Sequence, residues 1–213
     1  MAALKAAGIS HEQVEWYEFD VAEYGKHADF VTQVKRASGG ELAVVVNNAG
    51  IFGEGWSEGT YKQVCTVNAW GPARFLAQLH DQVNIGQVVV VSSGMGNLVG
   101  LSDEYKRAVT SASTLADLEA IPFQPSDSMV DSGKSASYRV SKAMVNRAVQ
   151  LLADKWGGSP RINAICPGWV RTDMGGSSAT RSVDEGSASV IATVNDPAQP
   201  NGSFFRDGKP IEW

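Results

Sequence analysis

The chain has 213 residues, 43% of them hydrophobic and 19% charged, which is typical of one globular domain able to bury a sizeable core. Its formal net charge of −5 offers no attraction to nucleic acid or to an anionic membrane surface. No apolar run is long enough to span a bilayer, and the first eight residues become polar too early for a signal peptide. The two cysteines lie far apart and the three histidines are scattered, so we expect a reduced, cytoplasmic protein without a metal site.

In chain order, the first 80 residues alternate between short apolar runs and segments with apolar residues at helical spacing. Residues 2–7 are expected to end a helix at Gly8, and residues 14–19 alternate as a strand does. A helix over 24–37 and a buried strand over 42–46 follow, and then a glycine-rich loop over 50–59. A helical pattern extends from 60 to 80, and Gly71-Pro72 should kink or divide it.

The second half continues the alternation after a long insertion. Residues 87–91 form the next expected strand, and the insertion covers about residues 94–137, with short helices over 103–109 and 114–120. A long helix is expected over 135–156, a strand over 161–165, a helix from the capping box Ser182-x-x-Glu185 to Ala192, and a short strand over 203–205. The alternation predicts one α/β domain over residues 1–213, in which helices cover both faces of a parallel sheet.

Tyr138 and Lys142 stand four residues apart near the start of the expected long helix. At that spacing the two side chains project from the same helical face. An ammonium beside a phenol stabilises the phenolate, so we expect Lys142 to lower the pKa of Tyr138 toward the range in which it can exchange protons. Such a pair also arises by chance, and its meaning depends on the motifs around it.

Those motifs lie on both sides of the pair. The upstream ones are Asn-Asn-Ala-Gly at 47–50, Asn68, and Ser92-Ser93 after the strand over 87–91. Downstream stands the segment Cys-Pro-Gly-Trp-Val-Arg-Thr-Asp-Met at 166–174. In this order the motifs resemble the short-chain dehydrogenase/reductase family, and the last segment and the chain end Ile-Glu-Trp are similar to its NADPH-dependent carbonyl reductases. The resemblance covers nearly the whole chain and implies a Rossmann-like, doubly wound, three-layer fold.

The resemblance implies a catalytic tetrad of Ser93, Tyr138, Lys142 and Asn68. Tyr138 would donate a proton to a carbonyl oxygen as hydride arrives from the nicotinamide, and Ser93 would hydrogen-bond the same oxygen. Lys142 would hold the nicotinamide ribose, and Asn68 would support a water chain from the lysine to solvent. Without the resemblance, Ser93 would be interpreted as a turn residue after a strand, and Asn68 as a polar residue that bends a helix.

The cofactor implied by the resemblance is NADP(H). The choice of NADP over NAD is carried over from the subgroup, because the segment that normally decides it is not in this chain. The implied contacts are Asp20 and Val21 at the adenine end, Asn48, Ala49 and Gly50 at the adenine ribose, Tyr138 and Lys142 at the nicotinamide ribose, and Pro167, Gly168, Val170 and Thr172 at the carboxamide. A loop that bears glycine lets the backbone approach a ligand closely, although a simple turn would use the same residues.

The front of the family's fold has no counterpart in this sequence. A sheet of this family opens with a strand, a glycine-rich turn and a helix whose N-terminus receives the pyrophosphate, and no such segment precedes Asp20 here. With these first two strands of the family fold absent, residues 42–46 would form an exposed apolar edge. Three outcomes remain open: the sequence is a fragment or truncated gene product, another chain supplements the fold, or residues 14–19 pair with 42–46. Backbone hydrogen bonds between the two segments would support the third.

We predict from the resemblance an oxidoreductase that reduces ketone, aldehyde or quinone carbonyls of small molecules to alcohols, with no nucleic-acid or membrane partner. In carbonyl reductases an insertion like that over 94–137 covers the helices through which other members form tetramers, so we expect a monomer, or a dimer through the exposed sheet edge. Trp56, Met95 and Met129 are candidates for lining an apolar substrate pocket, and Cys166 is expected to be a buried, inert thiol.

Two other functions are compatible with parts of the pattern. The rival is a truncated isoform that keeps the tetrad but binds nucleotide too weakly for turnover, and acts as a binding or regulatory protein. The loss of several oriented N–H donors at the phosphate site favours it. A nucleotide-sugar epimerase shares the Tyr-x-x-x-Lys pair, but the Pro-Gly-Trp-Val-Arg-Thr-Asp-Met segment and the short C-terminal region disfavour it.

Overall fold

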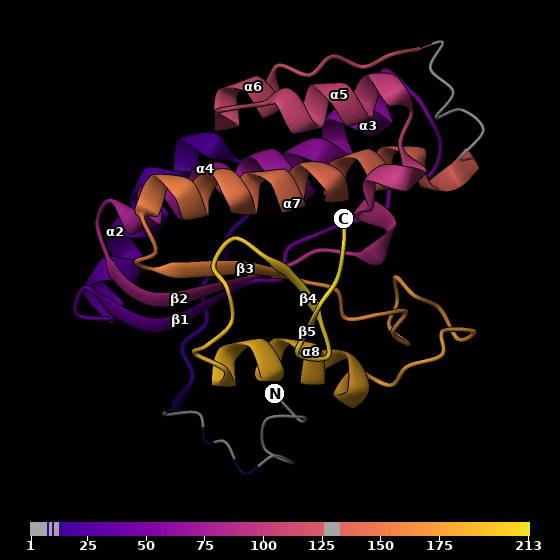
Figure 1. Cartoon of the computed structure of the whole chain (residues 1–213). Helices are drawn as coiled ribbons and strands as arrows, with labels where there is room; N and C mark the ends of the chain where they lie inside the picture. The colour runs from indigo at the N-terminus through magenta and orange to yellow at the C-terminus, as the bar shows by residue number, and fades with distance from the viewer. Residues whose placement is uncertain (1–7, 9, 11–12, 126–132) are drawn as a thin grey trace.

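The computed structural model describes residues 8, 10, 13–125 and 133–213, and within them the chain forms one five-stranded sheet with helices on both faces (Figure 1). The strands lie side by side in chain order: β1 (Glu41–Asn47), β2 (Asn84–Val91), β3 (Arg161–Ile165), β4 (Phe204–Arg206) and β5 (Lys209–Pro210). The first four run parallel, and β5 returns antiparallel to β4 in an edge hairpin. This confirms the Rossmann-like α/β class and the expected strands over 42–46, 87–91, 161–165 and 203–205.

Helices cover the sheet unequally. On one face lie α3 (Glu58–Cys65), α4 (Gly71–His80) and α7 (Ala136–Trp156), and α2 (His27–Ala37) packs against α4. The insertion contributes α5 (Asp103–Ser111) and α6 (Leu115–Glu119), which pack outside α7 as a further layer (Figure 1). The opposite face carries α8 (Val183–Asn195), which packs on β2, β3 and β4. None of the described helices is both long and apolar enough to cross a bilayer.

The caps that begin these helices follow from the sequence. Ser182 caps α8, its hydroxyl accepting the Glu185 N–H at 3.1 Å while the Glu185 carboxylate accepts the Ser182 N–H at 2.7 Å, as the capping box predicts. Thr114 and Asp117 form a second capping box at α6. The two short helices of the insertion, α5 and α6, lie close to the expected ranges 103–109 and 114–120.

The long helical pattern over 60–80 divides, as predicted, just before Gly71-Pro72. Its break is a π-helical turn, Thr66–Trp70, between α3 and α4. A π turn inserts one extra residue into a helix, and such turns are frequent at functional sites. This one carries Asn68, which is buried.

Residues 14–19 form no strand, and the prediction of one is wrong. Within the described residues β1 pairs only with β2, so the hypothesis that residues 14–19 fill the position beside residues 42–46 is also wrong. Phe19 instead packs on helices, with its ring stacked 4.0 Å from Phe30 and 4.7 Å from Phe75. Contact with this aromatic cluster buries the segment's aromatic end, which a strand at the β1 edge would not achieve. The helix expected over 2–7 lies outside the described residues.

The β1 edge is exposed, as expected. Val46 lies beside Val89 in register on the α8 face, but Val46 is 46% exposed whereas Val89 is fully buried. The difference arises because α8 covers β2, β3 and β4. The sheet is therefore well covered at its centre and open at β1.

Candidate active site

The predicted site residues gather at one edge of the sheet. Residues 48–50 follow β1 directly, and Ser93 and Pro167 each stand two residues beyond the carboxyl ends of β2 and β3. In a parallel α/β sheet the carboxyl ends of the strands meet in one crevice, which is where such folds bind ligands. The first turns of α7 bring Tyr138 and Lys142 to the same edge.

Tyr138 and Lys142 lie one turn apart on the face of α7 that is turned toward the sheet, and both are buried. The Lys142 Nζ lies 5.6 Å from the centre of the Tyr138 ring and donates a hydrogen bond to the Val91 carbonyl oxygen at 2.9 Å. Val91 is the last residue of β2, so this bond fixes the ammonium at the strand end. The Phe52 ring packs 5.0 Å from the Tyr138 ring and forms an apolar wall beside the phenol.

Burial, and not the neighbouring ammonium, dominates the electrostatics of this pair. Burial raises the pKa of Tyr138 above its ordinary value, while a hydrogen bond with the Ser93 side chain opposes that rise. The expectation that Lys142 lowers the pKa of Tyr138 is therefore wrong for this structure. Burial also lowers the pKa of Lys142 from 10.5 to about 8, because a desolvated ammonium is costly.

Ser93 follows β2 and caps a short 3-10 turn (Gly94–Gly96), its hydroxyl accepting the Met95 N–H at 3.2 Å. It thus has the turn role expected without the resemblance, and it opposes the rise in the pKa of Tyr138. Gly96 lets this turn touch α7: a Cβ there would lie 2.5 Å from the Lys142 carbonyl carbon. The Ser-x-x-Gly spacing thus holds the serine against the helix that carries the tyrosine.

Asn68 joins three segments. Its Oδ1 accepts the Ile51 N–H at 2.7 Å, and its Nδ2 donates to the Ile51 carbonyl oxygen at 3.0 Å and to the Ser141 hydroxyl at 2.9 Å. Ser141 in turn donates to the Tyr138 carbonyl oxygen at 2.8 Å. Gly50 lies between Asn68 and the Lys142 ammonium, since a Cβ there would be 3.4 Å from the amide oxygen and 3.5 Å from Nζ. The asparagine therefore ties the loop after β1 to α7.

The segment after β3 forms a folded loop. Gly168 has a positive φ of 80°, and the main chain of the following residues pairs with Arg181, through Trp169 and Arg171. Val170 forms the isolated bridge with Arg181, and the Thr172 hydroxyl accepts the Gly175 N–H at 3.2 Å. Pro167, Gly168 and Val170 thus stand at the sheet edge, whereas Thr172 is exposed and engaged in its own turn.

The residues expected at the adenine end are held less tightly. The Asp20 carboxylate is exposed and accepts the Ala22 N–H at 2.8 Å. Val21 is buried, and its carbonyl oxygen lies 2.9 Å from the His27 Nε2 and against Gly71, the first residue of α4. Asn48 is exposed beside half-buried Ala49 and Gly50. These residues belong to the same sheet edge but do not contact the tetrad, apart from Gly50.

Two family models match parts of this chain. Residues 1–105 match the family described as short chain dehydrogenase, and residues 126–198 match the family described as enoyl-(acyl carrier protein) reductase. The (+)-neomenthol dehydrogenase of Arabidopsis thaliana is 30% identical to this chain over an alignment of 247 positions, covering 94% of this chain and 80% of that protein. Carbonyl reductase (NADPH) 1 of Oryctolagus cuniculus is 40% identical over 70 residues, 32% of this chain and 25% of that protein. The chain belongs to the short-chain dehydrogenase family.

The solved structure of salutaridine reductase from Papaver somniferum agrees in fold, with a TM-score of 0.80 and 21% identity over 97% of this chain and 85% of that one. At that identity the likeness shows the fold alone. The short-chain dehydrogenases are oxidoreductases, so the chain is an enzyme of that class, and its relatives include carbonyl reductases.

Hydrogen-bond donors that could hold a dinucleotide are spread unevenly along this edge of the sheet. The Lys142 ammonium donates one hydrogen bond to the Val91 carbonyl oxygen and has further N–H groups beside Gly50, where ribose hydroxyls could accept them. The loop after β3 presents backbone at the same edge. Among the described residues no glycine-rich strand–turn–helix offers its N–H groups to a pyrophosphate. Within the described residues, the donors of this edge therefore lie beside Lys142 and in the loop after β3.

Three residues of the site were missed by sequence reasoning. Ser141 bridges Asn68 and α7, and its i+3 spacing from Tyr138 was a usable signal. Arg206 at the end of β4 donates to the Cys166 sulfur at 2.9 Å, and no local pattern announced it. Cys166 is buried as expected, but it accepts hydrogen bonds from the site's loops and so does more than fill space.

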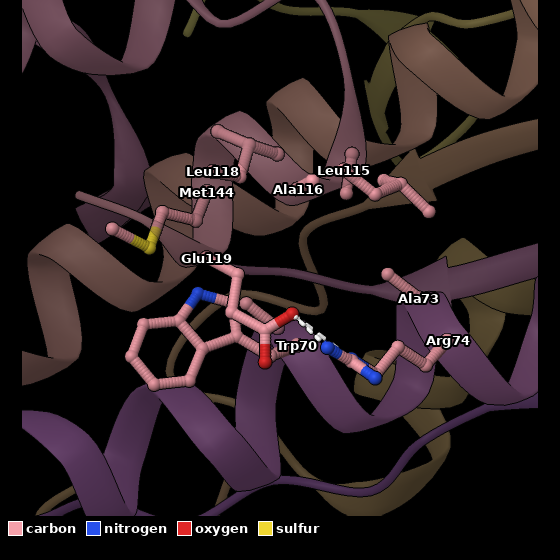
Figure 2. A pocket seen from close by; sticks show the side chains of 10 residues that line it. Trp70, Ala73, Arg74, Leu115, Ala116, Leu118, Glu119 and Met144 are labelled. Atoms are coloured by element: carbon pink, nitrogen blue, oxygen red, sulfur yellow. Dashed lines mark hydrogen bonds and ion pairs between the residues drawn. The ribbon is translucent and has the colours of Figure 1, made fainter.

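A cavity of about 190 Å³ lies between α4, α6 and α7 (Figure 2). Its wall is mostly apolar, and the ion pair between Arg74 and Glu119 crosses its rim. No tetrad residue lines it, although Trp70 and Met144 do, and each lies two residues along the chain from a tetrad member. The cavity thus lies behind the tetrad and is not where a substrate would meet Tyr138.

The candidates for a substrate pocket are only partly placed near the tetrad. Trp56 is held in the aromatic contact between α3 and the insertion, with its Nε1 donating to the Gln124 carbonyl oxygen at 3.0 Å, so its ring packs against the core there. Met95 is half-buried in the turn after Ser93. Met129 lies outside the described residues.

Proposed function

We propose that this short-chain dehydrogenase reduces the carbonyl group of a small ketone, aldehyde or quinone to an alcohol with NADPH. The observation that carries the proposal is that Ser93 and Tyr138 stand at the edge of the sheet where the buried Lys142 ammonium lies, 5.6 Å from the centre of the Tyr138 ring. A carbonyl oxygen placed against the two hydroxyls would receive two hydrogen bonds as its negative charge develops.

Tyr138 would be the proton donor. Its raised pKa keeps the phenol protonated at neutral pH, which suits an acid that gives its proton to the developing alkoxide. Ser93 would hydrogen-bond the same oxygen and hold it near the phenol. Asn68 would keep the loop after β1 and α7 in register, and the proposed water chain from Lys142 would begin beside it.

Lys142 would act on both the cofactor and the tyrosine. Its ammonium stands at the end of β2, where N–H groups beyond the bond to Val91 can hold ribose hydroxyls. Once the phenol has lost its proton, the same ammonium would stabilise the phenolate. Bound NADPH would supply the hydride that reduces the carbonyl carbon.

NADP(H) as cofactor is supported by the relatives, since the rabbit protein carries NADPH in its name. The proposed contacts are Asp20 and Val21 at the adenine end, Asn48, Ala49 and Gly50 at the adenine ribose, and Pro167, Gly168, Val170 and Thr172 at the carboxamide. All of them follow the carboxyl end of a strand or lie near the start of α4. This is the edge where dinucleotides bind in such folds.

An apolar small molecule is the substrate class that the surroundings support. Phe52 packs beside the Tyr138 ring, and Trp169 in the loop after β3 is 54% exposed. Both would contact an apolar substrate body while its carbonyl reaches the hydroxyls. We further propose that residues 1–213 act as a single domain, as a cytoplasmic monomer: α5 and α6 pack over the outer side of α7, where a partner's helices would otherwise dock.

The test is an NADPH oxidation assay with a quinone substrate, followed by absorbance. We expect turnover by the wild-type chain and a loss of at least about a hundredfold in kcat for Tyr138→Phe, because the phenyl ring keeps the packing but transfers no proton. Thermal unfolding of both proteins, with and without NADPH, controls for folding and for cofactor binding. Turnover by Tyr138→Phe at the wild-type rate would contradict the proposal.

A second function is favoured by the open β1 edge. A catalytically impaired isoform that acts as a binding or regulatory protein would keep the tetrad but gain little from NADPH, because the described residues offer no glycine-rich turn to the pyrophosphate. No NADPH consumption and no thermal shift with NADPH, from a folded wild-type chain, would favour this function over the reductase.

A further inference from the structure

The strands β2 and β3 separate at the reaction site, and a single sulfur atom joins the loops that follow them. The last main-chain bond between the two strands runs from the Ser92 N–H to the Ile165 carbonyl oxygen, at 2.7 Å. Beyond it, the Cys166 Sγ accepts the N–H of Gly94 at 3.1 Å and the N–H of Gly168 at 3.4 Å. The sulfur thus takes the place of the next bond between the strands, where two backbones that diverge can no longer reach each other.

Arg206 completes this contact from the third strand. Its Nη2 donates to the same sulfur at 2.9 Å, and β4 is held to β3 by the bond from the Cys166 N–H to the Phe205 carbonyl oxygen at 2.8 Å. Gly94 leaves room for the guanidinium, because a Cβ there would lie 2.5 Å from Nη2. Three donors from three segments therefore converge on one side chain that is only 2% exposed.

The segments so joined are the two sides of the proposed site. Gly94 follows Ser93 directly, so the position of its N–H fixes where the serine hydroxyl points. Gly168 belongs to the loop proposed to hold the carboxamide. A serine at position 166 would not bridge them as well, because its oxygen is smaller than sulfur and makes shorter hydrogen bonds, and the amides already lie 3.1 and 3.4 Å from the larger atom.

We propose that Cys166, held by Arg206, is a positioning residue that sets the distance between Ser93 and the Pro167-Gly168 loop. This role rests on the proposed reductase function for its effect on rate, but not for its effect on structure. Cys166 itself does not touch the reacting atoms. It acts through the Gly94 and Gly168 amides.

The chain offers a matched control, since its other cysteine, Cys65, is also fully buried but lies at the end of α3 away from these loops. Cys166→Ala and Cys65→Ala remove the same atom from two buried sites. We expect Cys166→Ala to lower kcat about tenfold, with a smaller change in KM, because a displaced Ser93 loses contact mainly with the charge that develops in the transition state. Cys65→Ala should keep kcat within about twofold of wild type. It should lower the melting temperature by about as much as Cys166→Ala does.

Amide hydrogen exchange gives a readout that does not depend on turnover. In Cys166→Ala the Gly94 and Gly168 amides should exchange about tenfold faster than in wild type, and in Cys65→Ala their rates should be unchanged. Cys166→Ser should restore protection at one of the two amides and part of kcat. If the wild-type chain shows no turnover, the reductase proposal fails, and the exchange rates still decide whether Cys166 joins the loops.

Arg206→Lys keeps the test decisive if Cys166→Ala does not fold. The shorter, single-pronged ammonium should weaken the hold on the sulfur and raise exchange at Gly94 and Gly168 together, with a loss in kcat smaller than that of Cys166→Ala. Equal kcat and equal exchange protection at Gly94 and Gly168 in Cys166→Ala and Cys65→Ala would overturn the proposal. So would a drop in kcat in both variants by the same factor.

Discussion

The two ends of the sheet's ligand-binding edge differ in how firmly they are built. At the β2–β3 end, Tyr138, Lys142 and Asn68 are buried. The Phe52 ring packs on Tyr138, while Lys142 donates to the Val91 carbonyl oxygen and Asn68 to that of Ile51. At the β1 end, Asp20 and Asn48 are exposed. Asn48 follows β1 and Ser93 follows β2, so a position after a parallel strand does not by itself account for the contrast.

The long helix α7 accounts for it. Fifteen of its residues are buried, and its first turns lie against the ends of β2 and the turn after Ser93. Among the described residues no comparable helix covers the β1 end, and Val46 on the adjoining strand remains half-exposed. The candidate site therefore lies at the part of the sheet that helices cover most fully, and we expect perturbations to be severe at the β2–β3 end and mild at the β1 end.

The largest effect should come from Gly96→Ala. The added methyl group would lie 2.5 Å from the Lys142 carbonyl carbon, so the turn or α7 must move, at a cost of about 1–3 kcal/mol. Reductase activity should fall with it, because the same turn carries Ser93. Urea unfolding and kcat would both report the change.

Gly59→Ala is the matched control, because that glycine lies in the first turn of α3 with no atom within 4 Å of an added Cβ. There alanine should raise the free energy of unfolding by about 0.5–1 kcal/mol, since it favours the helix, and should leave kcat unchanged. Equal stability changes in the two variants would show that the contact at Gly96 is not tight.

Next in size is the difference in stability loss when each of two neighbouring valines on one face of the sheet is replaced by alanine. Val89→Ala should cost about 2 kcal/mol, because it opens a cavity beneath α8, whereas Val46→Ala should cost less than about 1 kcal/mol because that side chain is already 46% exposed. Urea unfolding of both variants measures the difference directly. A cost at Val46 as large as that at Val89 would mean that something covers the β1 edge in solution.

The charge on Lys142 should make the rate of reduction depend on pH. With a pKa of about 8, the buried ammonium loses its proton as pH rises above 8, and kcat/KM for reduction should then fall by about tenfold per pH unit. A pH–rate profile measures this, and a flat profile up to pH 10 would contradict the role of the charged lysine.

The same group makes stability depend on pH. Below pH 8 the lysine is charged in both states, so folding carries the full cost of burying it. Between pH 8 and 10.5 the unfolded chain binds more protons than the folded chain, so this cost is relieved as pH rises. Lys142→Met removes the group, and its pH-dependent advantage over wild type should be up to about 3 kcal/mol below pH 8 and vanish near pH 10.5. Urea unfolding at a series of pH values tests the sign.

The smallest effect is expected at the β1 end. Asp20→Asn keeps an oxygen that can accept the Ala22 N–H, and Asp20→Ala removes it, so only the second should destabilise, by about 0.5 kcal/mol. At saturating NADPH neither should change kcat, because Asp20 is proposed to contact only the adenine end of the cofactor, away from the reacting atoms. A tenfold fall in kcat for either variant would break the contrast between the two ends.

The sequence predicted most of the central sheet and of the site, because those features depend on local patterns. Strands β1, β2 and β3 are short apolar runs, and Tyr138 and Lys142 share a helical face at a spacing that any helix enforces. Ser92-Ser93 stands after the apolar run over 87–91, and that order placed Ser93 at the carboxyl end of β2. In each case the residues and their neighbours along the chain contained the needed information.

The features that it did not predict depend on contacts between distant segments. Residues 14–19 alternate as a strand does, but an alternating segment becomes a strand only with a partner, and Phe19 found aromatic side chains instead. The pKa of Tyr138 was expected to fall because Lys142 is near in sequence, yet burial by the surrounding elements raises it. Arg206 reaches Cys166 across 40 positions of the chain, and nothing in its own surroundings signals that contact.

The π turn at Thr66–Trp70 also determines the direction of one side chain. Each residue of a regular helix is rotated by about 100° from the one before it, so a single additional residue re-aims everything that follows it. Asn68 lies within this turn, and its side-chain amide hydrogen-bonds both the N–H and the carbonyl oxygen of Ile51. Removing one residue between 66 and 70 would let α3 and α4 merge into one ordinary helix, and that amide would then face away from the strand end.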